Sequence, residues 1–174
     1  MDKLQFFRRS ANKPAGKGVG EYVNNSNDYT ELNKIKDWRK IFCSLWSEEI
    51  FEYEGYHYKS YEHAFQSEKF RCNGYNNIAF TFTIESNTEL GNSDGLNAYR
   101  ARKIRRLLDD EMDKWHQLVN DIKDKLYLTK FTGIEKAKNA LILTGEAEIW
   151  NDGPRIKRLR CHRLEKTRNI IKEL

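Results

Sequence analysis

The stretch SYEHAFQSEKF, residues 60–70, predicts the helix on which the interpretation of this chain depends. Ser60 occupies the position of an N-cap, directly before the helical pattern begins. On a period of 3.6 residues, Glu62, Gln66 and Lys69 fall on the same side as two phenylalanines. Because phenylalanine side chains favour burial, the three polar groups are expected at the margin of a buried face, where a cleft could open.

Glu62 has three interpretations from this pattern. A carboxylate in the first helical turn is stabilised by the helix dipole, which explains the residue without any function. A zinc site of the metalloprotease type is disfavoured, because EHAFQ (62–66) lacks the second histidine that H-E-x-x-H places one turn later. The third interpretation is a catalytic carboxylate that faces a pocket.

The sequence around this helix predicts a helix-rich α+β chain with a few short strands. Aromatic residues that alternate around a Glu-Gly turn predict a β-hairpin at 49–60. Further elements are expected as helices at 61–71, 96–108, 134–143 and 164–174, and as strands at 4–7 and 147–150. Irregular segments are expected at 8–21 and over most of 80–95. A long helix is indicated by apolar residues at helical spacing, namely Trp115, Leu118, Val119, Ile122 and Leu126.

The composition bounds the class of protein. A length of 174 residues fits one domain, spanning residues 1–174. Three widely spaced cysteines argue against a disulfide framework and favour a reducing compartment, so we expect the cytoplasm, or the host cytoplasm for a viral protein. The longest apolar runs are too short to cross a bilayer, and no membrane partner is expected. The net charge of +5 favours an anionic partner such as a nucleotide or a nucleic acid.

Two basic segments, RARKIRR (100–106) and RIKRLRCHR (155–163), have two interpretations each. Solvated faces of secondary structure explain them without a ligand. A surface that follows the phosphates of RNA or DNA explains them functionally. The loop GKGVG (16–20) lacks the spacing of a phosphate-binding P-loop, which favours a flexible loop over a ligand contact.

The longer stretch GYHYKSYEHAFQSEKF (55–70) resembles the signature of the NADAR (YbiA-like) family. The matching positions are Gly55, Tyr58, Ser60, Glu62, His63, Phe65, Gln66, Lys69 and Phe70. Weaker similarities lie in DWRKIFCSLW (37–46), AYRAR (98–102), ALILTGEAEIW (140–150) and in Trp115, fifteen residues before Lys130. The opening FFRRSANKPAGKGVGE (6–21) is similar to that of the subgroup found in phages, large DNA viruses and some microbial eukaryotes.

This resemblance implies a single, mostly helical YbiA-like domain that cleaves the C–N bond at the anomeric carbon of a ribosyl group. The implied substrates are an ADP-ribosylated nucleoside or nucleic acid, with guanine as the base, or a ribosylated small molecule such as an intermediate of riboflavin synthesis. No cofactor and no metal is implied. Both reactions pass through an oxocarbenium-like transition state, which a carboxylate can stabilise.

The resemblance also assigns roles. Glu62 becomes the catalytic carboxylate, Trp115 a flat wall for base or ribose, and Asp152 the counterpart of a late acidic loop. The substrate-binding positions become Ser44, Trp46, Gln66, Lys69, Arg102 and Arg8. On periodicity alone, Trp115 is equally explained as the start of a buried helix face, and each arginine as a solvated charge.

Two departures leave the activity open. The late loop is shortened to WNDGPRIKRLRCHRLEKTR (150–168), in which Asp152 is the sole candidate for the second carboxylate, and the asparagine expected at position 44 is Ser44. Retained catalysis with altered substrate preference is one outcome. The alternatives are a non-catalytic module that binds ADP-ribose or nucleic acid, and a structural protein, for example of a viral particle, that retains the fold.

Overall fold

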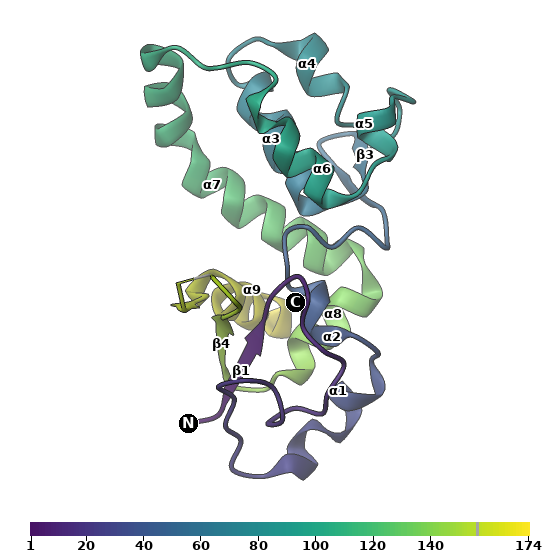
Figure 1. Ribbon diagram of the computed structural model, residues 1–174, viewed down its shortest axis with the longest axis vertical. Helices are drawn as coiled ribbons and strands as arrows, with labels where there is room; N and C mark the ends of the chain where they lie inside the picture. Colours follow the sequence, from purple (N-terminus) through teal and green to yellow (C-terminus); the bar gives the residue numbers. More distant parts are fainter. Residues whose placement is uncertain (156) are drawn as a thin grey trace. The chain divides into compact units, whose positions relative to one another are not determined.

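The computed structural model describes residues 1–155 and 157–174, which form an α+β fold as the sequence predicts (Figure 1). Its described residues form two compact units. Unit 1 combines Met1–Cys43 with Ile134–Leu174, and unit 2 is the continuous segment Ser44–Gly133. Each unit is described by itself below. Within the described ranges, no helix has both the length and the apolar character needed to cross a membrane.

Unit 1 is built on a three-stranded sheet. Its strands are β1 (Lys3–Phe6), β4 (Glu148–Asn151) and β5 (Leu159–Arg160), in the order β1-β4-β5. The first pair is parallel, with Lys3 opposite Glu148, and the second pair is antiparallel. The helices of this unit are η1 (Ser26–Tyr29), α1 (Thr30–Lys34), α2 (Trp38–Ile41), α8 (Glu135–Leu143) and α9 (His162–Glu173).

The predictions for unit 1 agree with these elements within two residues at most boundaries. β1 begins one residue before the expected start of its strand, and β4 begins one residue after the expected start. Helix α8 ends at Leu143, as expected. Gly145 follows with a φ of +64°, the left-handed conformation that commonly ends helices. The basic segment 155–163 contains β5, while its residue 156 lies outside the described residues.

The predicted loop 8–21 is held by one buried carboxylate. Glu21 accepts hydrogen bonds from the backbone N–H groups of Gln5 (3.0 Å), Gly16 (2.8 Å) and Gly18 (2.9 Å). It also forms an ion pair with Arg39 of α2, at 2.7 Å, and both side chains are almost completely buried. A Cβ at Gly18 would lie 2.7 Å from the Glu21 side chain, which explains why a glycine stands there.

Unit 2 begins with the predicted hairpin. Strands β2 (Phe51–Tyr53) and β3 (Tyr56–Tyr58) are antiparallel, with Phe51 opposite Tyr58. Both turn residues, Glu54 and Gly55, have positive φ, as the favoured two-residue hairpin turn requires. The following helices are α3 (Tyr61–Arg71), α4 (Asn76–Phe80), α5 (Glu89–Asn92), α6 (Gly95–Arg100), η2 (Ala101–Lys103) and α7 (Asp109–Gly133).

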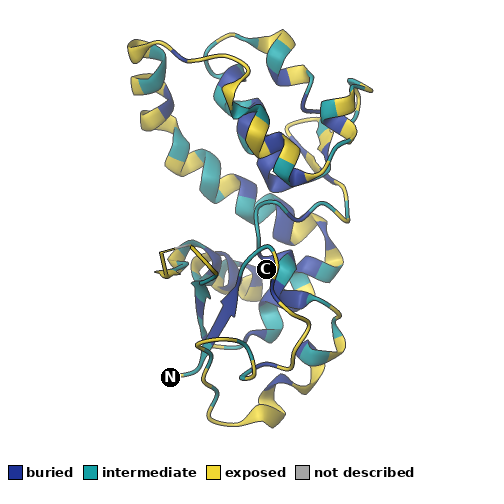
Figure 2. Cartoon of the chain, viewed as in Figure 1, coloured by how far each residue is buried: buried dark blue, intermediate teal, exposed yellow. Residues whose placement is uncertain are grey.

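Helix α3 is the centre of unit 2 and has the bounds that the sequence predicts. It packs against α4, α6 and α7. Buried residues therefore occur around most of its circumference, whereas α7 carries exposed residues along much of its length (Figure 2).

Two expectations for unit 2 are wrong, and a third holds for most of its range. The helix expected at 96–108 ends as α6 at Arg100, with one further 3-10 turn to Lys103. Most of the excursion expected at 80–95 is irregular as predicted, and it contains the short helix α5, which starts where the Thr88 side chain accepts the Gly91 N–H. The five-residue stripe of α7 is buried only at Trp115 and Leu126, and Leu118 is 37% exposed, because the neighbours of α7 cover only part of its length.

Candidate active site on helix α3

The start of α3 is fixed by Ser60 and His63. The Ser60 Oγ accepts the His63 backbone N–H at 3.2 Å and lies 2.7 Å from the imidazole Nδ1. The imidazole Nε2 lies 3.0 Å from the Leu90 carbonyl oxygen. A carbonyl can only accept, so Nε2 carries the proton and Nδ1 accepts from the Ser60 hydroxyl.

His63 is therefore a neutral structural group. Its side chain is fully buried, and this burial lowers the pKa of the imidazole to about 4. The contact ties the first turn of α3 to the segment that carries Leu90. Nothing in the sequence indicates this partner, since Leu90 takes part through its backbone carbonyl.

Glu62 precedes His63 in the first turn of α3 and is 7% exposed. Its backbone N–H donates to the Ser44 carbonyl at 3.1 Å, and its Oε1 accepts from Gln66 Nε2 at 2.7 Å. Burial raises the pKa of the Glu62 carboxyl, whereas the Gln66 amide, the Lys69 charge and the Ser44 hydroxyl oppose that rise. Within the described part of the chain, this buried carboxylate forms no ion pair.

Gln66 has an unused acceptor. The residue is 3% exposed and gives its Nε2 to Glu62, while its Oε1 is buried without a hydrogen-bond partner among the described residues. An unsatisfied buried carbonyl costs about 1–3 kcal/mol. Such a group beside a buried carboxylate is a position where the hydroxyl or N–H of a ligand would be stabilising.

Lys69 and Arg102 place positive charge near the carboxylate. The Lys69 Nζ donates to the Arg102 carbonyl at 3.2 Å. Partial burial lowers the pKa of Lys69, although the Glu62 charge opposes this effect. The Arg102 guanidinium lies over the Tyr99 ring, 3.8 Å from its centroid, and donates to the Tyr99 carbonyl.

The segment 44–47 supplies Ser44 and Trp46. Trp46 is 6% exposed, and the Lys130 ammonium lies 5.5 Å from its ring centroid. This segment packs tightly on α6, since a Cβ at Gly95 would lie 2.2 Å from the Leu45 carbonyl oxygen. The sequence does not indicate that Lys130 lies beside Trp46; it indicates Lys130 only through its spacing from Trp115 in the family resemblance.

Trp115 reaches α3 through an aromatic contact. Its ring packs edge-on against Phe65, with centroids 5.2 Å apart, and the residue is 5% exposed. Phe65 also stacks on Tyr61, with centroids 5.9 Å apart. The ring of Trp115 is thus part of a buried aromatic cluster, and its use as a wall for substrate stays a prediction.

Two predicted site residues belong to unit 1. Asp152 forms an ion pair with Arg158 at 3.4 Å, and its backbone N–H donates to the Phe6 carbonyl. Arg8 follows β1 in a turn and is half-buried. The site on α3 is therefore built from residues of unit 2, namely Ser44, Trp46, Glu62, Gln66, Lys69 and Arg102.

Comparisons of the chain with protein families, with curated proteins and with solved structures find no match. The functional argument therefore depends on the residues of this chain and on their geometry.

Proposed function

We propose that this chain is an N-glycosidase of the NADAR type, which hydrolyses the bond between the anomeric carbon of ADP-ribose and a guanine base. The resemblance over residues 55–70 supports the proposal. The observation that carries it is the state of Glu62, a buried carboxylate that is held by a neutral amide instead of a cation. Buried carboxylates with a raised pKa and no ion pair are typical of functional sites.

The chemistry follows from the charge that develops on the sugar. As the C1′–N bond breaks, its electron pair leaves with the base nitrogen and the ribose becomes oxocarbenium-like. The Glu62 carboxylate stabilises this positive charge, and it takes a proton from the water whose oxygen bonds to C1′. The departing base nitrogen receives a proton in exchange, so the products are ADP-ribose and the neutral base and Glu62 returns to its ionised form. Since Glu62 is buried, this interaction is stronger than it would be in solution.

Three further groups bind the substrate in this proposal. The free Oε1 of Gln66 accepts a ribose hydroxyl. Lys69 and Arg102 attract the diphosphate, and their positive charges oppose the rise in the Glu62 pKa that burial causes. The three free cysteines support a reducing location, and we place the reaction in the cytoplasm.

The pH dependence distinguishes a base from an acid. If Glu62 must be ionised, turnover falls as the pH drops through its raised pKa, which lies above the ordinary glutamate value of 4.5. A pH–rate profile under saturating substrate measures this limb. A profile that instead loses activity as the pH rises through the same region would assign Glu62 as a proton donor.

The central experiment is the Glu62→Gln substitution. The amide keeps the shape of the side chain, so we expect normal folding and a loss of ADP-ribose release from ADP-ribosylated guanosine by about 10³-fold. Glu89→Gln is the matched control, because Glu89 is also a first-turn acid of a helix of unit 2 but is exposed. Turnover by Glu62→Gln at the rate of Glu89→Gln would refute the assignment.

The same preparation tests the alternative functions. Calorimetry with ADP-ribose that detects binding, together with no product from the wild-type chain over long incubation, would assign a binding module. Parallel assays with ADP-ribosylated guanosine, an ADP-ribosylated oligonucleotide and a ribosylated small molecule identify the substrate class. Absence of both binding and turnover would favour a structural protein.

A further inference from the structure

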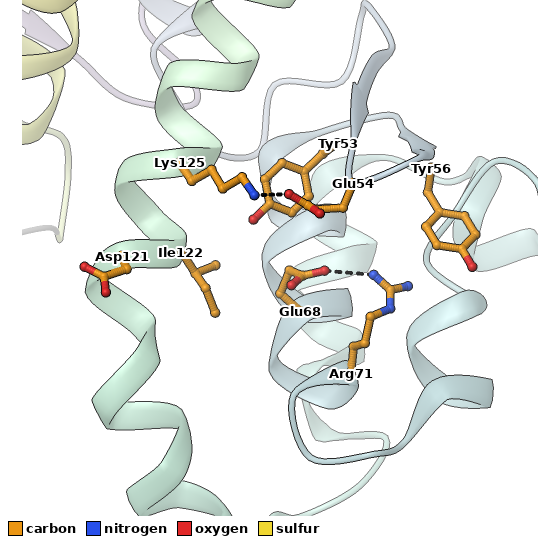
Figure 3. A pocket seen from close by; sticks show the side chains of 8 residues that line it. All are labelled: Tyr53, Glu54, Tyr56, Glu68, Arg71, Asp121, Ile122 and Lys125. Atoms are coloured by element: carbon orange, nitrogen blue, oxygen red, sulfur yellow. Dashed lines mark hydrogen bonds and ion pairs between the residues drawn. The ribbon is translucent and has the colours of Figure 1, made fainter.

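Unit 2 contains a cavity on a different face of α3 from Glu62. It has a volume of about 430 Å³ and lies among the β2–β3 hairpin, α3 and α7 (Figure 3). This volume is within the range of small-molecule sites. None of the residues assigned above to the Glu62 site lines it.

The inner wall of the cavity is a fixed ion pair. Arg71 Nη1 donates to Glu68 Oε1 at 2.8 Å, and Nη2 donates to the Ser67 hydroxyl at 3.2 Å. The Arg71 guanidinium also lies over the Tyr56 ring, 4.8 Å from its centroid. Because these contacts hold the guanidinium in place, Glu68 is held too, with its second carboxylate oxygen left over for another donor.

Tyr53 adds an unpaired hydroxyl to the same cavity. The residue is 3% exposed, and its hydroxyl forms no hydrogen bond in the described part of the chain. The hydroxyl points into the space between α3 and α7, on the side of Glu68 (Figure 3). Burial and the nearby Glu68 charge raise the pKa of Tyr53, so the phenol stays protonated and its oxygen can accept as well as donate.

The rim of the cavity includes an alkylammonium that belongs to the chain itself, the side chain of Lys125. The ammonium of Lys125 pairs with Glu54 and lies over the Tyr53 ring, 5.7 Å from its centroid. With Asp121, the lining has three carboxylates against two cations, a net charge of −1. Ile122 supplies an apolar wall between the rim and the inner carboxylate (Figure 3).

We propose that this cavity binds a short aliphatic amine, a diamine or polyamine. One ammonium donates to the free oxygen of Glu68 and to the Tyr53 hydroxyl. The methylene chain packs along Ile122, and a second ammonium meets the carboxylates of Glu54 and Asp121 at the rim. The excess of carboxylates over cations in the lining disfavours an anionic ligand. Amine binding in this cavity is independent of the reaction proposed at Glu62.

The test is calorimetric titration of the full chain with cadaverine, putrescine and spermidine at low ionic strength. Tyr53→Phe removes only the hydroxyl, so we expect it to weaken binding about tenfold. Tyr22→Phe is the matched control, because its hydroxyl is exposed and bonds to Asn24 in unit 1, and it should bind like the wild type. Glu68→Gln, if folded by circular dichroism, should bind more weakly still.

Free L-lysine separates a cation site from an amino-acid site, since it differs from cadaverine only by a carboxylate. We expect cadaverine to bind more tightly. Equal or tighter binding of lysine would overturn the proposal, as would an undetectable affinity at millimolar amine. Equal affinity of the wild type and Tyr53→Phe would also overturn it, because nonspecific electrostatic attraction of the amine would then explain the signal. Binding that is unchanged in Glu62→Gln separates this result from the test of the glycosidase.

Discussion

Replacing His63 with glutamine should change how the stability of the chain depends on pH. The imidazole is fully buried, and both of its nitrogens are used, by the Ser60 hydroxyl and the Leu90 carbonyl. Burial lowers its pKa from 6.5 to about 4, against the Leu90 contact that favours the charged form. Of the nearby charges, Lys59 lowers this pKa further and Asp94 raises it.

The size of the effect follows from these two pKa values. The folded chain binds this proton less readily than the unfolded chain, so the stabilisation is complete above pH 6.5 and is lost as the pH falls towards 4. Between pH 7 and pH 5 the free energy of unfolding should therefore decrease by about 2 kcal/mol through His63 alone. Glutamine does not titrate in this range, so this part of the decrease should disappear.

Urea denaturation at pH 7 and pH 5, followed by circular dichroism, measures the difference. We expect His63→Gln to be less stable than the wild type at pH 7 by about 1–3 kcal/mol, because its amide cannot replace both hydrogen bonds. Its loss of stability between pH 7 and pH 5 should be smaller than the wild-type loss by about 2 kcal/mol. His116→Gln, at an exposed position of α7, is the control and should behave like the wild type. Equal pH dependence of the wild type and His63→Gln would refute a buried neutral imidazole.

Two further substitutions test packing, one in unit 1 and one beside the Glu62 site in unit 2. Glu21→Gln leaves the Arg39 guanidinium buried without its charge partner, so the free energy of unfolding should fall by about 3–5 kcal/mol in a urea titration; a loss below about 1 kcal/mol would contradict the buried pair. Gly95→Ala places a Cβ 2.2 Å from the Leu45 carbonyl oxygen, so it should destabilise by about 1–3 kcal/mol and also lower turnover at the adjoining site. Gly133→Ala is its control, because a Cβ there makes only an ordinary contact at 3.8 Å. Similar stability and turnover of the two alanine variants would contradict the close approach.

The sequence predicted best those elements that are specified by nearby residues. The bounds of α3 are correct because Ser60 caps the helix through its own side chain. The hairpin is correct because Glu54 and Gly55 accept positive φ between two alternating segments. The end of α8 at Leu143, two residues before the positive φ of Gly145, depends on the same local conformational freedom.

The predictions that failed have two causes. One depends on neighbours that are distant in the sequence, and the other on a change in the sign of charge along the segment expected as one helix. Periodicity identified a face of α7, but it could not show that Leu118 has no neighbour to cover it. The change from the basic residues 100–106 to the acidic residues 109–111 marks the end of one helix and the start of the next, since cations favour helix C-termini and anions favour N-termini. That signal was present in the sequence and would have shortened the helix expected at 96–108.

The candidate site could be predicted only in part. Helical spacing correctly brings Glu62 and Gln66 together, and their side chains are hydrogen-bonded. The sequence expected them at the margin of a buried face, whereas both are buried. Helical spacing contains no information on Ser44 as a backbone partner of Glu62 or on the carbonyl of Arg102 as the acceptor for Lys69, because both contacts depend on tertiary folding.

Two glutamates of α3 show why burial alone does not define a catalytic group. Glu62 and Glu68 are six positions apart, and burial raises the pKa of both carboxyls. Glu68 has Arg71 at 2.8 Å, so the guanidinium compensates its charge and protonation would break an ion pair. Glu62 has the neutral Gln66 amide in that place and forms no ion pair among the described residues, so its protonation would break none. The same residue type on one helix is thus suited to proton transfer at one position and to holding a fixed charge at the other, and the partner residue decides which.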